Sequence, residues 1–283
     1  MQVEALTPHI GARVSGIDLA TLGPADRGRL RDLLEKHLVL FFVGQSLDLR
    51  AYKRFGRVMG TLETTPAVAK LDADQVVDII ESPKDMPRGA FTDQWHTDVY
   101  LSGRPPYASI LRPEYLPELG GDTLWANLYV AYEMMAEPLR RLADELELAM
   151  IRGASEFIHP VVRVNPRTGR RALNVNSLFS RRIIGVSVTE SDHLIQMFRT
   201  LAVRPEVQIR YRWTPDTVAM WDNGFTQHYA IADYDQPRRM QRLTVRGERV
   251  LGIKDYERAR RRDGSDGRDG MTKIKRAAQP GPR

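Results

Sequence analysis

The chain has 283 residues, of which 42% are hydrophobic and 28% charged, a composition typical of a folded globular protein. The absence of cysteine excludes disulfides, thiolate zinc sites, iron–sulfur clusters and thiol nucleophiles, so any metal must bind to histidine or oxygen ligands. No apolar run approaches the ~20 residues of a membrane span, and residues 1–13 lack the pattern of a signal peptide. We therefore expect a cytoplasmic protein with no membrane partner.

The net charge of +6 is concentrated at one end of the chain. Residues 254–283 contain ten Lys/Arg and five Asp/Glu, which gives +5 and leaves only +1 for residues 1–253. We predict a single folded domain over 1–253 and a basic, mobile tail over 254–283. Because the body is nearly neutral, we expect no nucleic-acid partner. A nucleic-acid-binding protein that uses the tail is the alternative, and its binding would depend steeply on salt.

Apolar periodicity and turn residues predict the elements in chain order. Helices are expected over residues 24–38, 47–59, 128–147 and 190–202, of which 128–147 is the longest. Strands are expected over residues 39–43, 76–80, 107–111, 123–125, 161–164, 172–175, 206–213, 217–222, 225–231 and 239–246. Short strands dominate the second half without a βαβ alternation. This pattern predicts a mainly β, α+β fold of the sandwich or jelly-roll type with helical insertions.

The motif with the clearest chemistry is Trp-His-Thr-Asp at 95–98. On an extended segment, residues i and i+2 point to the same face, so His96 and Asp98 offer an imidazole and a carboxylate to one point. His228 lies in a predicted strand pair and is a candidate third ligand. Two histidines and one carboxylate form the facial triad typical of non-haem Fe(II) oxygenases. On these residues alone, a surface carboxylate beside core histidines is the alternative.

Further motifs follow in order along the chain. They are Gly-Gly-Asp-Thr-Leu-Trp-Ala-Asn at 120–127, His-Pro-Val-Val-Arg at 159–163, Trp-Asp-Asn at 221–223, Thr-Gln-His-Tyr-Ala at 226–230 and Arg-Arg-Met-Gln-Arg-Leu-Thr at 238–244. Together with Trp-His-Thr-Asp, they resemble the taurine dioxygenase family, the TauD/TfdA-like Fe(II)- and 2-oxoglutarate-dependent dioxygenases. The resemblance runs from Ile10 to about Gly252 and covers nearly the whole body.

This resemblance implies a double-stranded β-helix, or jelly-roll, core. It implies that His96, Asp98 and His228 bind iron, and that Thr123 donates a hydrogen bond to the distal carboxylate of 2-oxoglutarate. The implied cofactors are Fe(II), the co-substrate 2-oxoglutarate and O₂. It also suggests a homo-oligomer, either a dimer or a tetramer.

The arginine that holds 2-oxoglutarate is Arg238 or Arg239. A dicarboxylate bound to a metal by one end needs a planar, bidentate cation at its other end, which is the role of arginine. Counting forward from the histidine with the family spacing reaches Arg239, whereas counting back from the following strand reaches Arg238. Loops absorb deletions more readily than strands do, which favours Arg238.

Two further residues match family positions that contact the primary substrate. The resemblance places Arg242 near an anionic group and Phe179 in an aromatic wall. Thr65 and Val68 stand where taurine-specific members have a histidine and a tyrosine, and Thr92 stands near the place of an asparagine. This departure from the family pattern disfavours taurine itself as the substrate.

We expect a dioxygenase that hydroxylates a C–H bond of a small anion and releases succinate and CO₂. Candidate substrates are a sulfonate, an alkyl sulfate, and an aryloxy or other carboxylic acid. A specialised-metabolite oxygenase, catalysing hydroxylation or desaturation, is the alternative. A non-oxygenase jelly-roll metal enzyme, such as an isomerase, is a weaker one.

Overall fold

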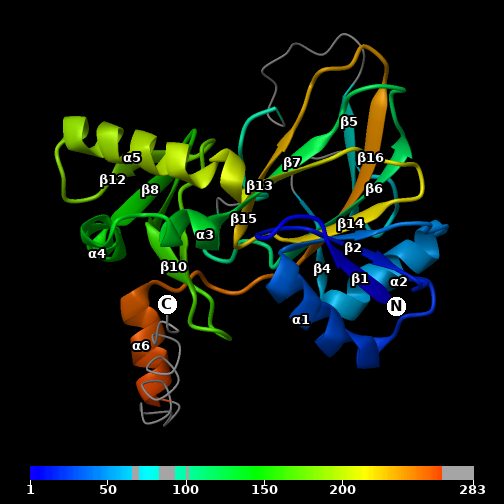
Figure 1. Ribbon diagram of the computed structural model, residues 1–283, viewed down its shortest axis with the longest axis horizontal. Helices are drawn as coiled ribbons and strands as arrows, with labels where there is room; N and C mark the ends of the chain where they lie inside the picture. The colour runs from blue at the N-terminus through cyan, green and yellow to red at the C-terminus, as the bar shows by residue number, and fades with distance from the viewer. Residues whose placement is uncertain (66–69, 83–92, 100–101, 263–283) are drawn as a thin grey trace, which may run out of the picture.

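The computed structural model describes residues 1–65, 70–82, 93–99 and 102–262 (Figure 1). Its helices are α1 (Arg27–His37), α2 (Leu49–Met59), α3 (Leu128–Glu133), α4 (Glu137–Glu145), α5 (Val188–Ala202) and α6 (Ile253–Arg262). Its strands are β1 (Gln2–Ala5), β2 (Ala12–Ser15), β3 (Val39–Phe42), β4 (Leu62–Glu63), β5 (Val77–Ser82), β6 (Ala108–Tyr115), β7 (Thr123–Asn127), β8 (Glu147–Arg152), β9 (Ser155–Pro160), β10 (Val162–Val164), β11 (Arg171–Leu173), β12 (Ser180–Ile183), β13 (Gln208–Tyr211), β14 (Val218–Asp222), β15 (Thr226–Ala230) and β16 (Arg238–Val245). No helix in these ranges is long and apolar enough to cross a membrane.

The largest sheet has eight strands and joins distant parts of the chain. Its order is β1-β2-β3-β14-β6-β16, and β4 and β5 both pair with the far edge of β16. Within it, β2 and β3 are parallel and the other pairs are antiparallel. The β2–α1–β3 connection is of the βαβ type, but the other pairs are antiparallel, so the sheet is not a doubly wound parallel sheet, in agreement with the prediction from the sequence.

A second sheet, with the order β13-β7-β15, faces the large one. His228 of β15 and Thr123 of β7 line the same cavity as Trp221 of β14 and Arg238 of β16. Two opposed antiparallel sheets are the architecture of a jelly roll. The predicted mainly β fold with helical insertions is confirmed.

The apolar run of β3 reflects burial on both faces. Val39 and Phe41 contact the core cluster on one side of the sheet, whereas Leu40 and Phe42 contact the cluster on the other side. Alternate side chains of a strand point to opposite faces, so a strand covered on both faces must be apolar throughout.

Helices cover the large sheet on the side away from the cavity. Leu34 of α1 and Phe55 of α2 pack with Leu40, Met220 and Leu243 in one cluster. Figure 1 shows α1 and α2 together beside the large sheet, while α3, α4 and α5 gather with β8 and β12 at the opposite end of the molecule. The helices thus hold the sheets without blocking the space between them.

The predicted helix over 128–147 is wrong. The chain instead forms α3, which ends at Glu133, and α4, which begins at Glu137. Pro138 lies in the first turn of α4, where its missing N–H has no cost, but it cannot continue a preceding helix. The longest helix is α5, with 15 residues. Strands β1, β2, β4, β8, β9 and β12 were not predicted.

The basic C-terminal segment begins with an ordered element. Residues Ile253–Arg262 form α6, which Figure 1 places below β10, and Tyr256 of α6 lies close to Gly169 in the β10–β11 turn. Residues 263–283 lie outside the described residues, so the predicted mobility of that part stays a prediction.

Candidate active site

Two histidines are brought together by a short antiparallel bridge. The backbone N–H of His96 donates to the carbonyl of His228 at 2.9 Å, and the N–H of His228 donates to the carbonyl of His96 at 2.8 Å. Their ring centroids lie 4.2 Å apart. Nδ1 of His96 lies 2.6 Å from the carbonyl of Gln94, and this contact directs Nε2 away from the backbone. Trp221 packs against the ring of His228 at 5.0 Å between centroids.

Asp98 is held on both its backbone and its side chain. Asn223 accepts a hydrogen bond from the Asp98 N–H at 2.9 Å and donates to the Asp98 carbonyl at 3.0 Å. Ser109 Oγ donates to Oδ2 of Asp98 at 2.7 Å. The other carboxylate oxygen, Oδ1, lies 3.8 Å from Nε2 of His228. One carboxylate oxygen is thus anchored while the other faces the histidines.

His96, Asp98 and His228 each offer a ligand atom, and these three atoms lie within 4.8 Å of one another. Such a cluster could hold a metal ion, and no other group of three of this kind occurs in the described ranges. The predicted triad is therefore assembled from two segments that lie about 130 residues apart.

The protonation states suit a divalent cation. Burial lowers the pKa of His96, and burial together with the charge of His96 lowers the pKa of His228 to about 3. Burial alone would raise the pKa of Asp98, but Arg242, then His228 and His96, hold it at about 2. At neutral pH the two imidazoles are neutral and the carboxylate is ionised, as metal ligands must be.

Arg238 and Thr123 lie on opposite sheets and line the same cavity. Nε of Arg238 donates to the carbonyl of Gly121 at 3.1 Å, whereas its Nη2 is buried and has no hydrogen-bond partner among the described residues. Burial lowers the pKa of Arg238. A buried guanidinium with an unused donor is costly unless a ligand pairs with it, so this end of the cavity fits a carboxylate.

Glycine is required where the chain passes over this arginine. Gly121 has φ +70°, and a Cβ there would lie 3.1 Å from Cδ of Arg238. The Gly120-Gly121 turn therefore gives Arg238 the space to reach the cavity. Arg239 points elsewhere: its Nε lies 3.2 Å from Glu114, and its side chain is 28% exposed. The structure thus places Arg238, and not Arg239, in the cavity.

The residues predicted to contact substrate fall in different places. Arg242 lines the cavity and forms an ion pair with Asp98. Phe179 is buried in the hydrophobic cluster that includes α3 and α5, and it is not among the residues that line the cavity. Thr65 is buried, and its hydroxyl has no partner among the described residues. Val68 and Thr92 lie outside the described residues.

The cavity itself is small and combines the ligand set with apolar walls. Its volume is about 50 Å³, and its apolar lining residues are Ile80, Leu111, Trp221 and Ala230. An apolar enclosure around a few convergent polar groups is typical of a small-molecule site.

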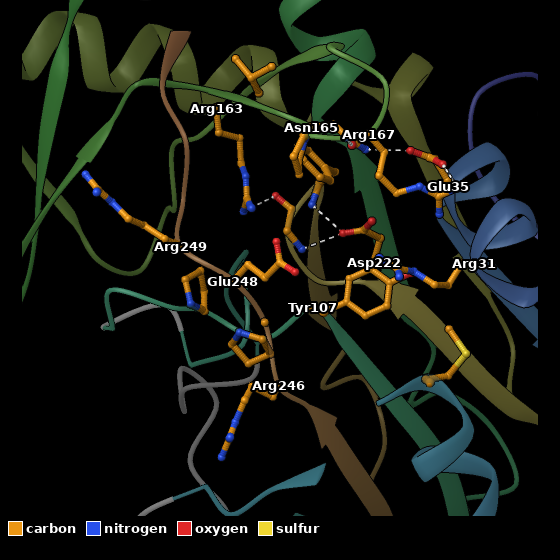
Figure 2. A pocket seen from close by; sticks show the side chains of 18 of the residues that line it. Arg31, Glu35, Tyr107, Arg163, Asn165, Arg167, Asp222, Arg246, Glu248 and Arg249 are labelled. Atoms are coloured by element: carbon orange, nitrogen blue, oxygen red, sulfur yellow. Dashed lines mark hydrogen bonds and ion pairs between the residues drawn. The ribbon is translucent and has the colours of Figure 1, made fainter. Parts of the chain in front are cut away.

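A larger pocket lies on the other side of β14 (Figure 2). Its volume is about 140 Å³, and Asp222 lines it whereas the preceding Trp221 lines the triad cavity. Figure 2 shows Tyr107, Asp222 and Glu248 near its centre, with Arg31 and Arg163 on two sides. Other lining arginines are engaged in ion pairs: Arg167 with Asp32 and Glu35, Arg246 with Glu63, and Arg249 with Asp255. The metal-ligand cluster lies in the smaller cavity, so we place the chemistry there.

Several supporting residues were not predicted from the sequence. Ser109 and Asn223 hold Asp98, Trp213 donates to Thr123, and Asp78 pairs with Arg242. A usable signal exists for Asp78 and Ser109, since each interrupts a short apolar run within its strand, and buried polar groups need partners. Trp213 and Asn223 give no comparable signal.

Comparison with known proteins agrees with this geometry. The family model described as "Taurine catabolism dioxygenase TauD, TfdA family" matches residues 2–244. The chain belongs to this family. It is 35% identical to an alpha-ketoglutarate-dependent sulfate ester dioxygenase of Pseudomonas putida, with 89% of this chain and 92% of the relative covered. It is 34% identical to an alkylsulfatase of Acinetobacter baylyi, with 89% and 87% covered.

A solved structure shares the fold over most of the chain. The crystal structure of a taurine dioxygenase from Burkholderia xenovorans superposes with a TM-score of 0.82 at 36% identity, covering 90% of this chain and 92% of that one. The predicted jelly roll is confirmed. As a TauD/TfdA family member, the protein is an Fe(II)- and 2-oxoglutarate-dependent dioxygenase that acts on a small molecule. Alpha-ketoglutarate is another name for 2-oxoglutarate.

Proposed function

We propose that this TauD/TfdA dioxygenase oxidises an alkyl sulfate ester at the carbon that carries the ester oxygen. In this proposal His96, Asp98 and His228 bind Fe(II), and Arg238 with Thr123 holds the far carboxylate of 2-oxoglutarate. The observation that carries the substrate class is the guanidinium of Arg242, which lines the cavity together with the apolar side chains of Ile80, Leu111, Trp221 and Ala230. Arginine suits a sulfate group, and the apolar walls suit an alkyl chain.

The relatives support this choice of anion. The Pseudomonas putida relative is named for sulfate esters and the Acinetobacter baylyi relative is named an alkylsulfatase. A yeast relative, from Saccharomyces cerevisiae and 28% identical, is named a sulfonate dioxygenase. We therefore place sulfonates second, and Phe179 would act on the substrate only through the packing of the wall behind the cavity.

The chemistry that Fe(II) and 2-oxoglutarate supply when bound is reduction of O₂ coupled to decarboxylation of the oxo acid, which yields succinate, CO₂ and an oxidant for a C–H bond. One oxygen atom enters succinate and the other hydroxylates the substrate carbon. The resulting hydroxyl and sulfate on one carbon collapse: the C–O bond to sulfate breaks, the hydroxyl loses its proton, and an aldehyde and hydrogen sulfate leave.

The residues of the chain contribute positions rather than oxidising power. Arg242 would orient the sulfate, while Arg238 and Thr123 would orient the co-substrate. Ile80, Leu111 and Trp221 would exclude water from the reacting carbon. Precise positioning of this kind supplies much of an enzyme's rate advantage.

A tailoring oxygenase is the second candidate. Pentalenolactone F synthase of Streptomyces avermitilis is 29% identical, with 83% of this chain and 90% of that relative covered. The apolar walls of the cavity also suit a neutral carbon skeleton. Such an enzyme would produce a hydroxylated or desaturated product without releasing sulfate.

Succinate formation separates these candidates. Anaerobic protein would receive Fe(II) and 2-oxoglutarate, then O₂, with a panel of alkyl sulfates, sulfonates, aryloxy acids and amino acids. We expect alkyl sulfates to stimulate succinate and to release one sulfate and one aldehyde per succinate, and His96→Ala to abolish all three. Succinate without sulfate release would favour a tailoring oxygenase. Substrate turnover without O₂ or succinate would indicate a non-oxygenase metal enzyme and overturn the proposal.

The remaining properties follow from the family and the charge distribution. We propose one catalytic domain over residues 1–253, with 254–283 as an appendage that is mobile beyond α6. We also propose a cytoplasmic homo-oligomer, dimer or tetramer, without nucleic-acid or membrane partners. Light scattering of the full chain, and its retention on DNA at low salt, test these points.

A further inference from the structure

Asp78 is a buried carboxylate within an otherwise apolar run, residues 76–80. It lies on β5 between Val77 and Ile79, and its side chain is only 1% exposed. A charged group in such a position is costly unless it is paired. Asp78 stands directly opposite Arg242 in the β5–β16 register, and its Oδ2 accepts hydrogen bonds from Nε at 3.2 Å and Nη2 at 2.9 Å.

These contacts fix the direction in which Arg242 points. Nε and Nη2 form one edge of the guanidinium, and Asp78 occupies that edge. Nη1 then faces Asp98, with which it forms a very close ion pair. Three of the five guanidinium N–H groups are engaged by the two carboxylates, so two remain for a ligand in the cavity.

Lys70 lies on the far side of the same carboxylate. Its Nζ forms a very close ion pair with Oδ1 of Asp78 and donates to the carbonyl of Thr65 at 2.6 Å. The Lys70 side chain is 16% exposed, so its charge is only partly screened by water. Asp78 therefore lies between two cations, one in the cavity wall and one behind it.

The charges of these three residues decide what the cavity attracts. Asp98 would be balanced by the metal that it is proposed to bind, so its charge belongs to the metal site and not to this group. Arg242 and Asp78 alone would then form a neutral pair, with no net attraction for an anion. Lys70 restores one positive charge to the group. In an enclosed, weakly screened site, one unit of charge changes the affinity for a charged ligand strongly.

We propose that Asp78 is a positioning residue for Arg242 and that Lys70 sets the net charge of the substrate subsite to +1, which selects a monoanion. This inference rests on the proposed function, which it narrows to substrates such as sulfate monoesters and sulfonates. Neutral analogues gain nothing from this charge. Dianionic analogues leave one charge uncompensated in a buried site.

A charge series of one chain length tests the proposal. The probes are hexan-1-ol, hexyl sulfate and hexyl phosphate, whose charges at pH 8 are 0, −1 and −2. Binding would be measured by calorimetry under anaerobic conditions on protein loaded with Fe(II) and 2-oxoglutarate. Turnover with hexyl sulfate in air would be followed in parallel as succinate.

Three variants leave the cavity wall unchanged; two of them change the charge, and the third, Lys70→Arg, keeps it. Lys70→Met should weaken hexyl sulfate binding by about 10-fold and leave hexan-1-ol unchanged, whereas Lys70→Arg should stay within about 3-fold of wild type. Asp78→Asn raises the subsite charge and should shift preference from hexyl sulfate toward hexyl phosphate by about 10-fold.

Lys53 provides a matched control. Like Lys70, it is a mostly buried lysine that forms ion pairs, and its side chain is 18% exposed. Its partners are the carboxylates of Asp72 at 2.9 Å and Asp74 at 2.8 Å. It does not line the cavity. Lys53→Met should therefore bind all three probes like wild type.

The outcomes separate this inference from the proposed function. If wild type turns over hexyl sulfate but Lys70→Met and Asp78→Asn bind the three probes as wild type does, the charge-setting role is overturned and the proposed function stands. If wild type binds hexyl sulfate no better than hexan-1-ol, both are overturned. Should Asp78→Asn fail to fold, Lys70→Met and Lys70→Arg decide the question, with 2-oxoglutarate affinity as the control for an intact site.

Discussion

Trp213 Nε1 donates a hydrogen bond of 2.9 Å to the hydroxyl oxygen of Thr123, and both residues are buried. A threonine hydroxyl has one proton to donate. Because its oxygen already accepts from Trp213, that proton is available for a ligand in the cavity that Thr123 lines. In the proposed function, the indole would thus set the role of the hydroxyl as a donor toward the carboxylate of 2-oxoglutarate.

Removing the indole N–H should weaken 2-oxoglutarate binding through Thr123 alone. We expect Trp213→Phe to raise the Kd for 2-oxoglutarate by about 5-fold and Thr123→Val by about 10-fold, in line with one lost hydrogen bond to a charged group. The double variant should bind no more weakly than Thr123→Val. Calorimetric titration of the wild type, the two single variants and the double variant with 2-oxoglutarate gives a double-mutant cycle. Additive losses would show that Trp213 acts by packing instead.

Arg238 and Arg239 differ in burial, and this difference predicts different phenotypes. Arg238→Met removes a buried guanidinium with an unused donor and should raise the Kd for 2-oxoglutarate by about 100-fold, the scale of breaking a buried charged pair. Arg239→Met removes a half-buried pair with Glu114 and should leave that Kd within about 2-fold. The opposite ranking would contradict the assignment of Arg238.

Ser109 supports the metal site through the outer oxygen of Asp98. Ser109→Ala leaves that buried oxygen without this donor, so metal affinity should fall by about 10-fold to 100-fold, as for other residues that orient metal ligands. Titration of the metal-free protein with Mn(II), followed by electron paramagnetic resonance, measures the loss directly. Ser102→Ala is the control and should bind Mn(II) normally: within the described ranges, the Ser102 hydroxyl accepts a hydrogen bond from the nearby Arg104 N–H and from no other group.

The sequence predicts the strands that bear one-sided or continuous apolar patterns, because buried positions of a strand carry apolar residues. The β10–β11 hairpin was predicted from its turn, in which Asn165 accepts backbone hydrogen bonds. Strands β8 and β9 pair with each other across a two-residue turn, but their residues alternate irregularly, so no local pattern predicts them. The other neighbour of β8 is β12, which comes from a more distant segment. Pairing of distant segments supplies stability that no local pattern contains.

The candidate site was predicted unevenly for a related reason. The His-x-Asp spacing places two ligands on one face by local geometry, whereas the third, His228, is one candidate among the six histidines until the family resemblance selects it. The contacts that hold the ligands join strands far apart in sequence, as Asn223 does with Asp98. Asp78 lies opposite Arg242 only because of the β5–β16 register, which residue type does not specify.

Asp222 makes stability depend on pH in the opposite direction to a carboxylate whose pKa is lowered by folding. Its Oδ1 accepts from the N–H groups of Gly224 at 2.9 Å and Phe225 at 3.2 Å. Burial nevertheless dominates and raises its pKa to about 6, although Arg163 acts against the shift. In the unfolded chain an aspartate has a pKa of ~3.9. Between these values the native state binds the proton and the unfolded state does not, so this group's contribution to stability falls as pH rises from about 4 to 6.

Asp222→Asn should remove this penalty, because an asparagine oxygen can still accept the two backbone hydrogen bonds without a charge. Relative to wild type, the variant should gain about 2 kcal/mol in free energy of unfolding between pH 4.5 and pH 7.5, with the gain complete near pH 6. Urea unfolding of both proteins across this range measures the difference between their free energies of unfolding. Groups that titrate alike in both proteins cancel in this difference. Asp192→Asn, on the exposed face of α5, should show no such trend. A constant difference between Asp222→Asn and wild type at all pH values would mean that the carboxyl does not titrate in this window.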